Sequence, residues 1–268
     1  MSRSEQLYPR EASSRWRDYE WEIIPSTPLP PAMNIALDEV LTRQVGAGAR
    51  RPTLRFWGWA APVVVIGRFQ SVRNEVQIEN SADLGVQIVR RITGGGAMFT
   101  EPGLDITYSL YAPPALVEGL SFPESYAFLD SWVVETFREL GIDAWYAPLN
   151  DITSAGGKIG GAAQARRFGA VLHHTMASYE MDPTLMLQVL RIGMEKLSDK
   201  GLRSADKRVG PLHQQTNLPR EAFFHALTER FKDLTGGELG EITDVEHQAA
   251  VELVRAKFST EEWTYLLP

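Results

Sequence analysis

The chain has 268 residues, 44% of them hydrophobic, which suffices for one large folded domain or for a domain with a small lobe. Its net charge of −7 argues against a nucleic-acid binder, which normally carries a basic face, and no apolar run approaches the roughly 18 residues of a membrane span. Cysteine is absent, which excludes disulfides, thiolate metal sites and a cysteine nucleophile in this chain.

The N-terminal residues are polar and charged and lack the apolar segment of a signal peptide. We therefore expect a mobile leader over residues 1–17, followed by a single folded domain over residues 18–268. The same features lead us to expect a cytoplasmic protein that has neither nucleic-acid nor membrane partners.

The first half of the expected domain contains strands around one amphipathic helix. This helix spans residues 32–45, where apolar residues recur at near-helical spacing, and Gly46 ends it. Residues 53–57 and 63–66 are rich in β-formers, and we expect them to be neighbouring strands. The other elements expected here are a strand over 19–24, a short helix from a cap at Asn74 toward Leu84, a strand over 86–91 and its return strand over 105–111.

The second half begins with a long amphipathic helix over residues 122–140, which Gly141 closes. Residues 154–157 have the composition of a hairpin turn. The expected strands are 143–146, 151–153, 158–165 and 170–180, and the expected helices are 185–196, 220–234 and 243–257. This order lacks a regular βαβα alternation. It predicts an α/β protein of the α+β type, with a mixed, mostly antiparallel sheet, packed helices and a helical C-terminal segment.

Two arginines stand directly before three consecutive glycines, between two expected strands. The segment reads Arg90-Arg91-Ile92-Thr93-Gly94-Gly95-Gly96-Ala97-Met98-Phe99-Thr100. Glycine loses more conformational entropy on folding than any other residue, so such a run indicates that something approaches the backbone closely. Bare N–H groups beside guanidinium forks suit a phosphate or a phosphate ester. The alternative is a glycine-rich hairpin turn with solvated arginines.

A second unusual stretch places Lys158 between glycines on an expected strand, directly after a tight turn. Small neighbours leave room for a ligand beside the ammonium, which suits a carbonyl or phosphate oxygen that gains charge. Asn150 and Asp151 precede this turn and could hold Mg²⁺ through oxygen ligands. The alternatives are a solvated surface lysine and an ordinary Asn-Asp turn.

Together these two stretches resemble the lipoate–protein ligase A family, whose relatives include octanoyltransferases and biotin protein ligases. The family pattern of two arginines, a spacer and three glycines matches residues 90–96, and the pattern around the family's lysine matches residues 150–163. Supporting matches are Met33-Asn34, Asp38-Glu39, Phe56-Trp57, Gly67-Arg68-Phe69-Gln70, His173-His174-Thr175, Lys257-Phe258 and Trp263. The chain is thus identified as a biotin/lipoate protein ligase catalytic domain, and the resemblance covers residues 21–263.

The resemblance implies a fold like that of class II aminoacyl-tRNA synthetases and biotin synthetases. It also implies that ATP, with Mg²⁺, and (R)-lipoate form lipoyl-AMP. The lipoyl group then passes to a lysine on the lipoyl domain of a 2-oxoacid dehydrogenase or on the glycine cleavage H protein. Many ligases of the family carry a further accessory domain, in some relatives a separate chain. We expect residues 18–268 to form a catalytic domain without it.

The resemblance assigns roles to residues of this sequence one by one. Lys158 is the catalytic residue, between the lipoyl carbonyl and the α-phosphate. The residues implied for ATP and lipoyl-AMP binding are Arg91, Gly94, Gly95, Gly96, Ala97, Met98, Phe99, Asn150, Asp151 and Lys158. The residues implied for the lipoyl tunnel are Trp57, Arg68, Gly161 and His173, and Asp151 is the implied metal ligand.

Two kinds of departure separate this chain from its relatives. The related octanoyltransferases carry the acyl group on a cysteine, and this chain has none, which favours the ligase. Thr100 stands where the family usually has a histidine, Met98 replaces a valine, and Leu104 replaces an asparagine. A threonine cannot titrate near neutral pH. Two alternatives therefore stay open: a transferase that uses a preformed activated acyl donor, and a lipoate-binding subunit that needs an accessory chain.

Overall fold

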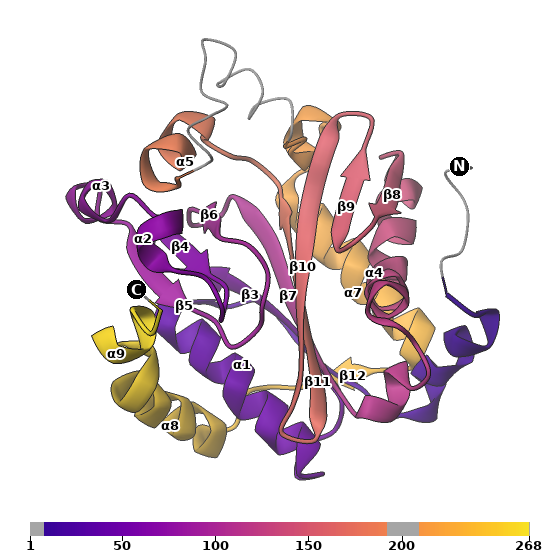
Figure 1. Cartoon of the computed structure of the whole chain (residues 1–268). Coiled ribbons are helices and arrows are strands. Elements are labelled where there is room, and N and C mark those ends of the chain that lie inside the picture. Colours follow the sequence, from indigo (N-terminus) through magenta and orange to yellow (C-terminus); the bar gives the residue numbers. More distant parts are fainter. Residues whose placement is uncertain (1–7, 192–208, 268) are drawn as a thin grey trace.

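The computed structural model describes residues 8–191 and 209–267, and within them a nine-stranded sheet forms the centre of the fold (Figure 1). Its strands are β1 (Glu22–Ile24), β2 (Pro28–Leu29), β3 (Thr53–Trp59), β7 (Asp105–Ala112), β8 (Ala144–Ala147), β9 (Asp151–Ser154), β10 (Gly157–Arg167), β11 (Ala170–Ser178) and β12 (Glu238–Leu239). The order is β12-β1-β3-β7-β11-β10-β9-β8, with β2 paired to β3. All pairs from β3 to β8 are antiparallel, which confirms the expected mixed, mostly antiparallel sheet.

A separate three-stranded sheet carries the glycine run. It consists of β5 (Gln87–Arg90), β4 (Val63–Ile66) and β6 (Met98–Thr100), with β4 in the middle, parallel to β5 and antiparallel to β6. The expectation that β3 and β4 are neighbours is wrong, because they belong to different sheets. The return strand of the glycine run is β6 and not β7. All four residues of β4 are buried, so its sequence has no polar face that could indicate its partner.

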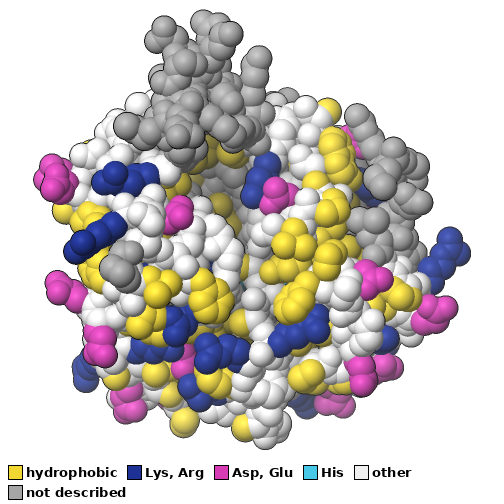
Figure 2. Space-filling view, in the orientation of Figure 1, with side chains coloured by type: hydrophobic (Ala, Val, Ile, Leu, Met, Phe, Trp, Pro, Cys, Tyr) yellow, Lys and Arg dark blue, Asp and Glu magenta, His cyan; other side chains and the backbone are white. Residues whose placement is uncertain are grey.

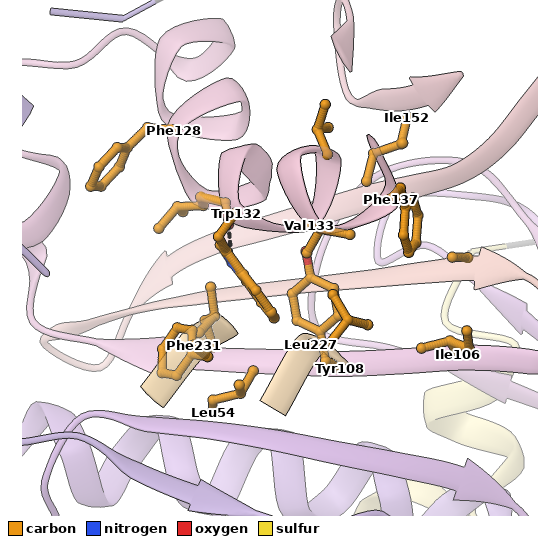
Figure 3. Packing of buried hydrophobic residues seen from close by; sticks show 14 of the residues in the cluster. Leu54, Ile106, Tyr108, Phe128, Trp132, Val133, Phe137, Ile152, Leu227 and Phe231 are labelled. Carbon is orange, nitrogen blue, oxygen red and sulfur yellow. Dashed lines mark hydrogen bonds between the residues drawn. The ribbon is translucent and has the colours of Figure 1, made fainter. Parts of the chain in front are cut away.

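Helices cover both faces of the central sheet (Figure 1). One face packs against α1 (Pro31–Gly46), which in turn packs against α8 (Asp244–Leu253), and the other face packs against α4 (Phe122–Glu139) and α7 (Arg220–Thr235). Figure 3 shows the second interface, where Trp132 of α4 lies between Phe231 of α7 and Tyr108 of β7. Strand residues alternate between the faces, so Tyr108 points to α4 while its neighbours Thr107 and Ser109 face the opposite side.

Local signals explain where α4 begins. Ser121 and Glu124 form a reciprocal capping box, and proline stands in the first turn, where its missing N–H costs nothing.

The expected cap at Asn74 is wrong, because Asn74 lies inside α2 (Val72–Glu75), which Ser71 precedes. A separate helix, α3 (Ile78–Asp83), follows.

Short elements complete the C-terminal part. The helix expected over residues 185–196 is seen as α5 (Pro183–Val189), and its expected end lies outside the described residues. A π-helical segment, Val254–Phe258, follows α8, and α9 (Glu261–Thr264) comes next. Among the described residues, no helix combines the length and apolar character that spanning a bilayer requires.

The prediction of a mobile leader is wrong for residues 10–17. They form most of the 3₁₀ helix η1 (Arg10–Asp18). Trp16 is 1% exposed and stacks at 4.9 Å on Phe128 of α4 and at 5.4 Å on Trp21. One buried tryptophan removes a large apolar area from water, which anchors a segment whose average composition is polar. Residues 1–7 lie outside the described part.

Candidate active site

A cavity of about 630 Å³ opens between the central sheet and the three-stranded sheet. The surface is hollowed there in Figure 2. Its walls come from β3, β7, β10 and β11 on one side and from the glycine run, β6 and α5 on the other. The predicted site residues that line it are Trp57, Arg91, Gly96, Ala97, Met98, Phe99, Asn150, Lys158 and Gly161. The predicted site residues that do not line it are Arg68, Gly94, Gly95, Asp151 and His173.

Lys158 reaches the cavity from β10. Its side chain is 45% exposed, and Nζ lies 2.7 Å from Asp151 Oδ1 on the neighbouring strand β9. A Cβ atom at Gly161 would lie only 3.0 Å from Nζ, so the glycine leaves the space that this ammonium uses. Asp151 takes one of the three N–H donors of Lys158. Among the described residues no partner is seen for the other two, which could contact a ligand.

Asn150 holds the strands together beside Lys158. Its side-chain Nδ2 donates to the main-chain carbonyl of Ala162 at 2.6 Å, and the main-chain carbonyl of Asn150 accepts from the Ala162 amide at 2.8 Å. Among the described residues no three histidine or carboxylate side chains gather in a group that could hold a metal ion. Any Mg²⁺ at Asp151 would therefore depend on phosphate and water oxygens for its remaining ligands, an arrangement that Mg²⁺ commonly adopts.

The two arginines of the motif are buried rather than solvated, so the alternative of a solvated hairpin is wrong. Arg90 donates to the carbonyls of Gly67, Arg68, Gln70, Trp263 and Thr264 and thereby joins α9 to the end of β4. Arg91 donates to the carbonyls of Gly94 and Gly96 at 2.6 and 2.8 Å, and burial lowers its pKa to about 10. Much of its hydrogen-bonding capacity thus shapes the glycine loop, defined here as residues 91–97.

Two of the three glycines, Gly95 and Gly96, have different reasons to be glycine. Gly95 has φ +89°, a conformation that side chains disfavour, and its carbonyl oxygen would lie 2.1 Å from a Cβ at Gly67. These two positions therefore serve close packing of the backbone. Gly96 lines the cavity, and a Cβ there would meet nothing within 4 Å. Open space at Gly96 suits the approach of a ligand.

The adjacent histidines of β11 point to opposite faces of the sheet. His174 lines the cavity, while His173 lies on the far face and contacts Asp130 of α4 at 2.8 Å. The expectation that His173 lines the lipoyl tunnel is therefore wrong, because it is His174 that faces the cavity. Both rings are buried, because both faces of β11 are covered in this part of the sheet. The strand sequence therefore lacks the alternation of polar and apolar residues that would indicate which histidine faces the cavity.

His174 belongs to a chain of hydrogen bonds that reaches the glycine loop. Its Nδ1 lies 2.8 Å from Asp38 Oδ2 on α1, and its Nε2 lies 2.8 Å from Thr93 Oγ1. Thr93 Oγ1 in turn accepts from Arg91 Nε at 3.0 Å. This chain, called the Asp38 relay below, connects helix α1 to the loop through four side chains.

Charges in the relay follow from burial. Burial lowers the pKa of His174 and outweighs the opposing effect of Asp38, so the ring is neutral at pH 7. Burial also raises the pKa of Asp38, but the hydrogen bonds from His174 and Tyr111 and the charge of Arg55 outweigh this effect and place the pKa below its ordinary value. The neutral ring therefore donates Nδ1–H to the carboxylate and accepts the Thr93 hydroxyl proton at Nε2.

Arg68 was assigned to the lipoyl tunnel, and this assignment is wrong. Its guanidinium lies 4.6 Å from the ring centre of Trp263, outside the cavity. Cavity residues that the sequence did not single out include Trp59, Asp105 and Thr107. A signal for them exists, because Asp105 and Thr107 are polar residues at a spacing of two in a strand whose alternate positions are apolar.

The cavity thus places an ammonium and open backbone on its rim and apolar side chains deeper inside. Ile35, Trp57 and Val65 supply part of the apolar lining, and all three are buried. Such a site accepts a ligand that has an anionic or polarised centre and an apolar tail.

Comparisons with known proteins identify the family. A model described as the lipoyl protein ligase A/B catalytic domain matches residues 30–232. The octanoyltransferase LipM of Geobacillus kaustophilus is 29% identical, covering 91% of this chain and 98% of its own. A chain from a Thermoplasma acidophilum lipoylation system, a bipartite lipoate protein ligase and its E2 lipoyl domain, superposes with a TM-score of 0.81 at 31% identity over 93% of this chain and 98% of its own.

A lipoate-protein ligase A bound with ATP superposes with a TM-score of 0.78 at 29% identity, over 92% of this chain and 100% of its own. These matches confirm the class II synthetase-like fold expected from the sequence. They also show that this protein is an enzyme of the lipoate ligase and transferase group. The chain belongs to the family of lipoyl protein ligase A/B catalytic domains.

Proposed function

We propose that this enzyme uses ATP to activate lipoate as lipoyl-AMP and then transfers the lipoyl group to a lysine of a lipoyl domain. One observation carries the proposal: Lys158 and the backbone of Gly96–Phe99 line the same cavity from opposite walls. Solved relatives support the two substrates, since one was determined with bound ATP and another belongs to a system with an E2 lipoyl domain.

The proposed reaction consists of two displacement steps at the same site. In the first, a lipoate carboxylate oxygen attacks the α-phosphorus of ATP and pyrophosphate leaves. In the second, the acceptor amine attacks the acyl carbon, loses a proton and releases AMP. Negative charge grows on the α-phosphoryl oxygens in the first step and on the acyl oxygen in the second. A positioned ammonium stabilises both, which is the role proposed for Lys158.

The glycine loop and β6 supply the complementary wall. The N–H of Gly96 can hold a phosphate oxygen without a side chain in the way, and N–H groups of residues 97–99 that do not pair with β4 can add to it. Arg91 fixes the shape of the loop through its hydrogen bonds to the Gly94 and Gly96 carbonyls. Asp151 and Asn150 are the proposed oxygen ligands for Mg²⁺, which would neutralise phosphate charge when bound.

A second function is favoured by the octanoyltransferase relative. In that case the enzyme would transfer an acyl group that another protein has already activated. A route through an acyl-enzyme thioester requires a thiol, and this chain has no cysteine. The same cavity would then accept a preformed acyl adenylate and not a thioester donor.

The test is acylation of a lipoyl domain followed by mass spectrometry. Reactions contain the protein with ATP, Mg²⁺ and lipoate, with preformed lipoyl-AMP, or with octanoyl carrier protein and no nucleotide, each with and without the small subunit of a bipartite ligase. The proposal expects a lipoyl adduct from ATP and lipoate. An adduct from lipoyl-AMP but not from ATP and lipoate would show the second function, and an adduct from octanoyl carrier protein would show transfer from a thioester donor and contradict both. The glycine cleavage H protein serves as a second acceptor.

Lys158→Ala tests the proposed catalytic residue. Loss of one donor at a site of developing charge costs about 100- to 1,000-fold in rate, so ATP-dependent acylation should fall by that factor. Lys232→Ala is the matched control, because Lys232 makes a similar exposed ion pair with Glu229 at 2.8 Å, on α7 and outside the cavity. Equal rates in the two variants would remove Lys158 from the mechanism.

A further inference from the structure

Two large apolar side chains are exposed outside the cavity, on neighbouring segments. Phe122 begins α4 and is 54% exposed, and Leu149 lies between β8 and β9 and is 55% exposed. The hydroxyl of Tyr146 donates to the main-chain carbonyls of Pro123 and Leu149, which holds the two segments together. Figure 2 shows hydrophobic side chains gathered to the right of the hollow. Exposed apolar side chains that gather in one place mark surfaces that bind a partner.

A positive charge adjoins this apolar surface. The guanidinium of Arg166 lies 4.6 Å from the ring centre of Phe122, and its Nε donates to Gln164 Oε1 at 3.2 Å, which fixes its direction. In the part of the chain that the structure describes, Arg166 forms no ion pair. Glu124, the carboxylate nearest to Phe122 along the chain, accepts from the Ser121 amide in the capping box of α4. An arginine beside an aromatic ring therefore suits a partner that presents a carboxylate next to an apolar surface.

The position of these side chains relative to Lys158 limits what can cover them. Asn150 follows Leu149 directly and lines the cavity, and Asp151 comes next and lies 2.7 Å from Lys158 Nζ. Two residues of chain span at most about 7 Å, so Leu149 borders the place where the proposed reaction occurs. The acceptor lysine belongs to a folded protein, whose surface must meet the rim of the cavity when its amine reaches the acyl carbon. The acceptor protein is therefore the partner that must come closest to this surface.

We propose that Phe122, Leu149 and Arg166, called the docking patch below, bind the protein that carries the acceptor lysine. The inference rests on the proposed transfer to a lipoyl domain. The phenylalanine ring and the leucine side chain pack against an apolar surface of the acceptor, and Arg166 pairs with a carboxylate near the acceptor lysine. The chain as a whole has a net charge of −7, so it repels an acidic acceptor elsewhere and attracts it at this edge.

Separate assays of the two reaction steps test the docking patch. Pyrophosphate release with ATP, Mg²⁺ and lipoate measures activation in the absence of the acceptor. Mass spectrometry of a lipoyl domain, titrated against the full chain with preformed lipoyl-AMP, measures transfer and gives the KM for the acceptor. Nα-acetyl-lysine replaces the lipoyl domain in a parallel reaction, corrected for the rate without enzyme, because this small amine has no protein surface that could meet the patch.

Substitutions in the docking patch should raise the KM for the lipoyl domain. Arg166→Glu should raise it about 10-fold, because it places a like charge against the acceptor carboxylate. Phe122→Ala combined with Leu149→Ala should raise it about 5-fold through the loss of apolar contact. Pyrophosphate release and transfer to Nα-acetyl-lysine should keep their wild-type rates, since none of the three residues lines the cavity. The wild-type KM should also rise with NaCl concentration, and this rise should be smaller in Arg166→Gln.

Exposed residues far from the cavity serve as matched controls. Leu239 is 63% exposed in β12, at the opposite edge of the central sheet from β8, and Val245 is 75% exposed on α8. Leu239→Ala combined with Val245→Ala should keep the wild-type KM, and so should Arg255→Glu in the exposed part of the π-helical segment. Equal KM values for the lipoyl domain in the patch variants and in the control variants would overturn the docking patch.

Two other occupants of the patch would be recognised with the same variants. If the patch joined two copies of this chain, Arg166→Glu would halve the mass measured by light scattering and leave the acceptor KM unchanged. If the patch bound octanoyl carrier protein, the KM for that donor would rise and the KM for the lipoyl domain would not. Either result would overturn the proposal.

The docking patch and the proposed function fail in different assays. If the wild type transfers from lipoyl-AMP but forms none from ATP and lipoate, with or without an accessory subunit, the use of ATP falls and the patch stands on the transfer assay. If the patch variants keep the wild-type KM for the lipoyl domain while activation proceeds, the patch alone falls. If no lipoyl domain accepts the lipoyl group from either donor, both fall.

Discussion

Asp38→Asn should weaken both the fold and the glycine loop. Asp38 is buried on α1 and accepts hydrogen bonds from Ser109 at 2.9 Å, Tyr111 at 2.6 Å and His174 at 2.8 Å. Its carboxylate also lies 3.8 Å from the buried guanidinium of Arg55. The substitution keeps the shape of the side chain and removes its charge.

The expected loss of folding stability follows from the groups that stay buried after the substitution. Arg55 loses its only ion-pair partner among the described residues and stays buried. Removing one partner of a buried pair costs about 3–5 kcal/mol, which is a large share of a typical domain stability of about 5–15 kcal/mol. If the new amide nitrogen faces His174, the Nδ1–H loses its acceptor, and the contact to Thr93 and Arg91 loosens. We therefore also expect the KM for ATP to rise.

Urea unfolding followed by tryptophan fluorescence measures the first effect, and steady-state acylation measures the second. Asp130→Asn is the control, because Asp130 likewise accepts from a tyrosine, a histidine and a threonine but forms no ion pair with an arginine in the part of the chain that the structure describes. It should cost only about 1–3 kcal/mol and leave the KM for ATP unchanged. If both variants lose the same stability and keep the same KM, neither Arg55 nor the Asp38 relay matters as described.

Two further predictions concern the loop and the pH dependence. Gly67→Ala places a Cβ 2.1 Å from the Gly95 carbonyl oxygen, so the glycine loop must shift and the rate of acylation should fall at least 10-fold. Gly58→Ala is the control and should keep its activity, because the nearest atom to the added Cβ lies at 3.8 Å. Equal rates in the two variants would contradict the packing argument. The folded-state pKa of Asp105, about 6, lies above the ordinary value of 3.8, so the stability it contributes is complete below about pH 4 and is lost as pH rises through 6. Asp105→Asn does not titrate there, and its free energy of unfolding relative to the wild type should increase by about 2 kcal/mol between pH 4 and pH 7. A flat difference in urea unfolding over this range would refute the assignment.

Much of the fold could be predicted from local sequence signals. The helices over residues 31–46, 122–139 and 220–235 follow from apolar periodicity and their closing glycines, and the hairpin before Lys158 follows from its turn residues. Such signals act over a few residues, so they survive without knowledge of the partner. The sheet to which β4 belongs depends on a partner distant in sequence, and no local pattern specified it.

The residues of the candidate site likewise fall into two groups, those that the sequence indicates and those that only the fold places. The sequence by itself indicated the glycine loop and Lys158, because consecutive glycines and a lysine between glycines are unusual in any context. Only the tertiary structure decided that His174 and not His173 faces the cavity, that Arg91 shapes the loop, and that Arg68 lies outside. Which face of a strand is buried, and whose carbonyls satisfy a guanidinium, depend on segments that meet only when the chain folds.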